Sequence, residues 1–101
     1  MEGIIGVAWF GDEVTYRRAL SVFSDAENMP DSFADWRALV GKQCGLIQER
    51  GDKALRVDID PATFADWCVS RGFAPNSQGR IAYTSHAVLE YLKTGEGNFV
   101  E

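Results

Sequence analysis

The chain has 101 residues, 46% hydrophobic and 12% aromatic, which is the size of one modest domain with its own core. Acidic residues outnumber basic ones by 15 to 10, and the formal charge of −5 leaves no basic surplus for neutralising phosphates, so we expect no nucleic-acid partner. The longest apolar run, residues 3 to 11, is far shorter than the roughly 20 residues that span a bilayer. It also lacks a basic leader and a cleavage site, so we predict a cytoplasmic protein without a membrane partner.

The N-terminal apolar run predicts the first strand. Residues 4 to 10 are apolar throughout, which suits a strand covered on both faces better than an edge strand facing water. Asp12 then provides a helix N-cap, and apolar side chains recur with helical spacing from Tyr16 to Phe23. We therefore predict a helix over residues 13 to 24.

A polar stretch with a proline, residues 25 to 31, separates this helix from a second one. Apolar residues from Phe33 onward keep a helical period, which predicts a helix to about Arg50. Gly41 and Gly45 each cost this helix up to about 1 kcal/mol relative to alanine, so it is weakest in its middle.

Alternating apolar and charged side chains over residues 54 to 60 predict a second strand with one apolar face. Asp60 and Pro61 then begin a third helix, because aspartate accepts from unpaired backbone amides and proline has no amide to leave unpaired. This helix is expected to run to Arg71 and to end at Gly72.

The C-terminal part predicts one more helix and a tail. After a loop over residues 73 to 78, apolar side chains from Ile81 to Leu92 predict a fourth helix that ends near Gly95. The short polar tail, residues 95 to 101, is expected to fray.

These elements predict a single α/β domain over residues 1–101 with the order βααβαα and a small parallel sheet. More than 40 residues and two helices separate the strands, so a parallel crossover is favoured over a hairpin. Because a sheet of two strands is marginal, it needs an extension. Either residues 98 to 100 add a third strand or the sheet continues across a homodimer interface, and the shortness of the tail slightly favours the dimer.

Two segments of the chain are alike. Residues 30 to 36 and residues 61 to 67 share five identical positions at an offset of 31, and the similarity ends after Trp36 and Trp67. This indicates that the two segments are similar helix N-termini rather than a duplicated binding element. In each, a hydroxyl residue followed three positions later by an acid resembles a capping box.

The cysteines and the histidine are the candidates for catalysis. His86 is the only histidine, so imidazole chemistry would have to use it, with a Cys68 thiolate as nucleophile. Cys68 follows Trp67 inside a predicted helix rather than at an electropositive helix start, so we favour a packed thiol. Cys44 is expected to be buried as well, without a disulfide.

Metal and anion sites have weak signals. Asp58 and Asp60 could bind magnesium together, but Asp60 as an N-cap would use its oxygens on backbone amides, so we predict no metal. Residues 76 to 80 could hold a small anion through Ser77 and Arg80, although Ser77 as a plain N-cap with a solvated Arg80 is favoured. No phosphate loop, dinucleotide fingerprint or nucleophile elbow occurs, so we expect no cofactor.

Several short segments, read together, carry a resemblance to a protein family. They are Tyr16-Arg17, Pro30-Asp31-Ser32, Trp36, Val57-Asp58-Ile59-Asp60-Pro61, Phe64, Trp67-Cys68, Gly72 and Arg80-Ile81-Ala82-Tyr83. Through them the chain, roughly from residue 4 to 85, resembles a family of small uncharacterised bacterial proteins. The resemblance implies a bacterial cytosolic setting and the βααβαα order, and it implies nothing about mechanism because the family has no assigned activity.

Two functions stay open at this point. The first is a non-catalytic protein-interaction module or homodimeric accessory protein, whose acidic surface and exposed aromatic side chains engage a protein partner. The alternative is a small enzyme or anion-binding protein with a pocket near Cys68, His86 and Arg80. The alternative requires these three side chains to converge.

Overall fold

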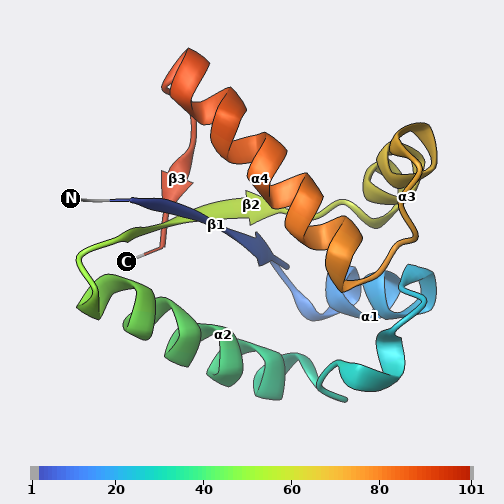
Figure 1. Ribbon diagram of the computed structural model, residues 1–101. Helices are drawn as coiled ribbons and strands as arrows, with labels where there is room; N and C mark the ends of the chain where they lie inside the picture. Colours follow the sequence, from blue (N-terminus) through green and yellow to red (C-terminus); the bar gives the residue numbers. More distant parts are fainter. Residues whose placement is uncertain (1–2, 101) are drawn as a thin grey trace.

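A three-stranded mixed sheet with helices on both faces forms the fold in the computed structural model, which describes residues 3 to 100 (Figure 1). Strand β1 (Ile4–Trp9) pairs in parallel with β2 (Lys53–Asp58), and β2 pairs antiparallel with β3 (Asn98–Phe99). The helices are α1 (Glu13–Val22), α2 (Phe33–Glu49), α3 (Pro61–Arg71) and α4 (Ser77–Thr94), with a 3₁₀ helix η1 (Ala26–Asn28) before α2. The α/β class is confirmed, and the order βααβαα is matched up to the added β3.

Local capping interactions explain where most helices begin and end. The Asp12 carboxylate accepts from the Thr15 amide at 2.8 Å and begins α1, as predicted. Gly72 ends α3 with φ of 78°, a left-handed conformation that glycine adopts at little cost. The start of α4 differs from the prediction, because the side chain of Asn76 rather than Ser77 caps it, accepting from the Gly79 amide.

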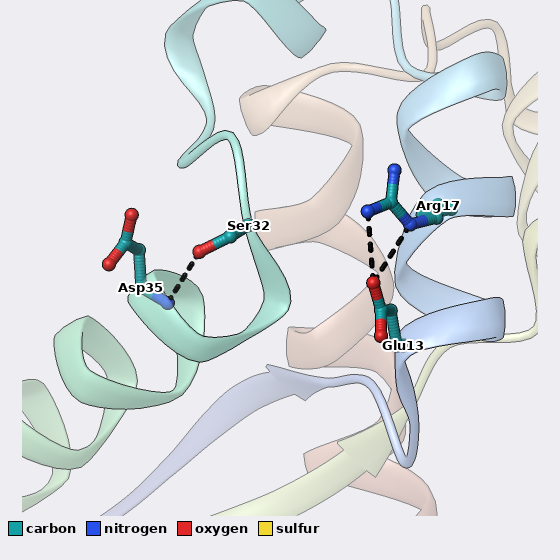
Figure 2. A network of polar contacts seen from close by, with 4 residues as sticks. All are labelled: Glu13, Arg17, Ser32 and Asp35. Atoms are coloured by element: carbon teal, nitrogen blue, oxygen red, sulfur yellow. Dashed lines mark hydrogen bonds and ion pairs between the residues drawn. The ribbon is translucent and has the colours of Figure 1, made fainter.

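The two similar segments begin their helices differently. Ser32 is the N-cap of α2, where its hydroxyl oxygen accepts from the Asp35 amide at 3.0 Å (Figure 2). In α3 the cap is Asp60, which accepts from the amides of Ala62 and Thr63, so Thr63 already lies inside the helix. The capping prediction is therefore confirmed for Ser32 and wrong for Thr63, because a stronger cap lies three residues earlier.

Helices α4 and α2 cover opposite faces of the sheet (Figure 1), so successive side chains of β1 point alternately toward one helix and the other. On one face, a Cβ atom at Gly6 would lie 2.7 Å from the Thr84 carbonyl oxygen, so only glycine allows α4 to come this close. On the other face, Trp9 packs edge-on against Trp36 of α2, with the ring centroids 5.5 Å apart.

The hydrophobic core is centred at the carboxyl end of β1, among α1, α2 and α3, and extends along α2 to Cys44. Phe10, Tyr16 and Phe64 are its largest fully buried aromatic side chains. Phe10 meets Tyr16 edge-on at 5.3 Å, an arrangement that adds about 0.5 to 1.5 kcal/mol beyond the area it buries. The Tyr16 hydroxyl donates to the Pro30 carbonyl, which gives this buried polar group its partner.

The C-terminal tail completes the sheet on the side of β2. The Val100 amide donates to the Ala54 carbonyl at 2.8 Å, and the Gln48 side chain donates to the Val100 carbonyl at 2.9 Å. Phe99 also packs edge-on against Tyr91 of α4. The expectation of fraying over residues 95 to 101 is thus corrected for residues 98 to 100, whereas Glu101 lies outside the described residues.

Strand β1 occupies an edge of the sheet. Among residues 3 to 100, the strand order β1-β2-β3 leaves one side of β1 without a neighbouring strand, although α4 and α2 contact its two faces. The sequence predicts that β1 is covered on both faces and is not an edge strand. The second part of this prediction is wrong, because β1 lies at the edge of the sheet. An apolar run alone does not distinguish these cases, because helices can bury the faces of a strand whose edge stays open.

Candidate functional site at the open edge of the sheet

Cys68 is packed in the interior of the protein. Its side chain is fully buried on α3, and a Cβ atom at Gly79 would lie 3.1 Å from its sulfur. Burial raises the pKa of the Cys68 thiol, so the reactive thiolate is disfavoured. The packed-thiol interpretation agrees with this environment, and Cys44 is likewise buried and free.

His86 lies apart from Cys68 in a shallow surface cavity. Its side chain is 40% exposed and lies 3.9 Å from the Glu90 carboxylate, one turn along the same helix. The cavity of about 400 Å³ also includes Trp67 and Arg71, but neither Cys68 nor Arg80 lines it. The structure therefore does not bring Cys68, His86 and Arg80 together in one cavity.

Arg80 is held in a largely buried ion pair instead of being solvated. Its guanidinium makes two hydrogen bonds to the Asp25 carboxylate, of 2.9 and 2.7 Å, and lies 4.6 Å over the Phe23 ring. Bonding to Arg80 lowers the pKa of Asp25 below its ordinary value, and the backbone amide of Ser77 contributes to this shift. The predicted anion position at the start of α4 is thus occupied by a carboxylate of the protein itself.

The two aspartates considered as magnesium ligands, Asp58 and Asp60, have separate partners. Asp60 caps α3, and the Asp58 carboxylate lies 3.0 Å from the Arg56 guanidinium. Among residues 3 to 100, no group of three or more His, Cys, Asp or Glu side chains is placed to hold a metal ion.

A cavity of about 550 Å³ lies beyond the carboxyl ends of β1 and β2, where parallel α/β sheets commonly bind ligands. The N-termini of α1 and α3 lie beside it, but the carboxylates of Asp12 and Asp60 already accept from their backbone amides. These amides are therefore occupied, and the cavity is lined by the carboxylates of Asp58 and Asp60 as well as by Arg18, so its lining carries charges of both signs.

A second cleft, of about 500 Å³, follows the open edge of β1 between α2 and α4. Its lining is apolar or uncharged except for Arg80, which the ion pair with Asp25 neutralises. The rim carries exposed hydrophobic side chains, among them Ile5 on β1, Leu39 on α2 and Ile81 on α4. We call this cleft and its rim the edge cleft.

Exposed apolar side chains recur along both helices beyond the edge cleft. Leu46 lies two turns beyond Leu39 on α2, and Leu92 lies three turns beyond Ile81 on α4. Both distal leucines are more than half exposed. Their spacing places them on the same helical stripes as the residues at the cleft. Each of the two helices therefore exposes more than one apolar side chain on the stripe that reaches the edge cleft.

The backbone of β1 presents unpaired hydrogen-bonding groups to the edge cleft. The carbonyls of Gly3 and Trp9 accept from the Lys53 and Ile59 amides of the β2 side, each at 2.9 Å. Because the N–H and C=O groups of successive residues point to opposite sides of a strand, those of Ile4, Gly6 and Ala8 point outward. This edge carries neither charge nor proline, the usual protections of an exposed strand.

Sequence reasoning missed the edge cleft, although two signals for it were present. The apolar run of β1 contains no charged residue, and apolar positions such as Leu39 and Leu46 widen the stripe of α2 beyond what one buried face needs. What the sequence could not show is that α2 and α4, far apart along the chain, flank the same strand.

Comparison with protein-family models, curated proteins and solved structures finds no match to this chain. The resemblance to small uncharacterised bacterial proteins therefore stays an expectation. None of the helices within residues 3 to 100 combines the length and the apolar character needed to cross a bilayer.

Proposed function

We propose that the protein is a non-catalytic protein-interaction module that binds an extended polypeptide segment along β1. The observation that supports this most is the open edge of β1, whose outward backbone groups lie in a mainly apolar cleft where the only charged lining residue, Arg80, is paired with Asp25. Strand addition uses these features, because main-chain hydrogen bonds hold the added segment while flanking side chains select it. The setting we propose is the bacterial cytosol, in line with the resemblance and with two free cysteines.

The environments of Cys68, His86 and Arg80 support a binding role rather than an enzymatic one. An enzyme or anion site built on Cys68, His86 and Arg80 would need a shared pocket, whereas these residues lie in separate environments. The edge cleft, in contrast, combines apolar area with orienting hydrogen-bond groups, the combination that binding surfaces use.

The test is a titration of isotope-labelled protein with a short, extended peptide of alternating valine and threonine, followed by nuclear magnetic resonance at low micromolar concentration. We expect shifts of the amide signals of Ile4, Gly6 and Ala8 and of the neighbouring Ile81. The surface residue Val69 on α3, 80% exposed, should not respond. Absence of shifts along β1, or shifts confined to the surroundings of His86, would contradict the proposal.

A further inference from the structure

We infer that the segment bound along β1 is β1 of a second copy, paired antiparallel about a two-fold axis at Gly6. This inference rests on the proposed function and specifies its partner. The result would be a continuous six-stranded sheet in the order β3-β2-β1-β1-β2-β3.

The outward backbone groups of β1 are self-complementary. Residues Ile4, Gly6 and Ala8 present N–H and C=O groups to the open edge, and they are symmetric about the central one. In an antiparallel pair centred on Gly6, Ile4 of one copy faces Ala8 of the other, and Gly6 faces Gly6. Every outward donor then meets an acceptor, which is the condition of a closed two-fold interface.

The charge distribution also favours a second copy. Each chain carries a net charge of −5, so two copies repel each other, and this repulsion is smallest when they meet through a neutral face. The edge cleft is such a face, because Arg80 and Asp25 cancel each other and the other lining residues are uncharged. A strongly charged partner segment would find no complementary charge there.

The size of this face comes near to what a stable dimer needs. The six residues of β1 extend about 20 Å along the edge, and the sheet with a helix on either side is about 30 Å thick. A face of these dimensions approaches the roughly 800 Å² per partner of a standard interface. In the dimer, the Ile81 side chains of the two α4 helices would lie near the axis and lose their exposure to water.

The experiment is light scattering behind a sizing column, from low micromolar to submillimolar concentrations, on the full chain and two variants. Ile81→Glu introduces a charge at the edge cleft, where the wild-type side chain is 65% exposed and the monomer loses little. Val69→Glu makes the same chemical change at an even more exposed position on α3 and serves as the matched control. Circular dichroism confirms that both variants fold.

The inference predicts a wild-type dimer, an unchanged Val69→Glu dimer, and a dissociation constant at least about tenfold higher for Ile81→Glu, because two buried glutamates would face each other. A wild-type chain that stays monomeric at all concentrations overturns the second copy as partner. So does an Ile81→Glu variant that dimerises as tightly as the wild type. If the monomeric chain still binds the valine–threonine peptide along β1, the proposed function stands without this inference. If it binds nothing there, both fail.

Discussion

The two edges of the sheet are built in opposite ways. At one edge, β3 is only two residues long and lies beside the charged Arg56, which limits pairing with another chain. At the other edge, β1 offers six uncharged residues, flanked by apolar side chains of α2 and α4. The C-terminal tail thus covers the β2 side of the sheet as β3, whereas the β1 edge is left suited to pairing with an added strand.

The largest effect should come from prolines placed on the two sides of β1. Val7→Pro removes an amide that points toward β2 and should lower the free energy of unfolding by about 3 kcal/mol. A hydrogen bond between the two strands is lost, and the proline ring would clash with the backbone of β2. Ala8→Pro removes an outward amide and should cost the monomer about 1 kcal/mol or less. Urea unfolding of both variants at low concentration checks the contrast, and equal losses would refute the assigned edge.

Deleting residues 98 to 101 should destabilise the opposite edge by about 2 kcal/mol. The deletion removes the hydrogen bonds of Val100 to Ala54 and Gln48 and uncovers part of β2. A lower urea midpoint, with the association state unchanged, is the expected result. An unchanged midpoint would show that β3 does not support the sheet.

The ion pair between Asp25 and Arg80 should make stability depend on acidity. Because the pKa of Asp25 is lowered in the folded chain, the pair stabilises the protein above the ordinary aspartate pKa. This contribution is lost as the pH falls below about 4 and through the folded-state pKa. At neutral pH, Asp25→Asn should cost about 1 to 2 kcal/mol.

The control for this pH effect is the same variant at low pH. Unfolding free energies measured from pH 7 down to pH 2.5 should converge for wild type and Asp25→Asn as the carboxylate of the wild type protonates. Parallel curves across the whole range would mean that Asp25 is not the group responsible.

The smallest effect is expected for the exposed pair of Glu13 and Arg17 on α1, which lie 2.9 Å apart (Figure 2). Both side chains are more than half exposed, so Glu13→Gln should change the free energy of unfolding by no more than about 0.5 kcal/mol. Neither residue lines the edge cleft. A change in the association state of this variant would therefore argue against the edge cleft as the interface.

Much of the fold could be predicted because its signals are local. Asp12 and Asp60 cap the helices that follow them, and Gly72 ends α3, through contacts within a few residues. The pair of Asp25 and Arg80 could not be predicted, because its partners are 55 residues apart and meet only in the folded chain. The same holds for the open edge of β1, since strand order depends on contacts between distant segments rather than on hydrophobic pattern.

The central claim, that β1 pairs with β1 of a second copy, is tested most directly by amide hydrogen exchange at low and high protein concentration. The account predicts that the outward amides of Ile4, Gly6 and Ala8 become protected as the concentration rises. The inward amides of Ile5 and Val7, which bond to β2 within one copy, should be protected at both concentrations. Outward amides that exchange at the same fast rate at every concentration would contradict the claim.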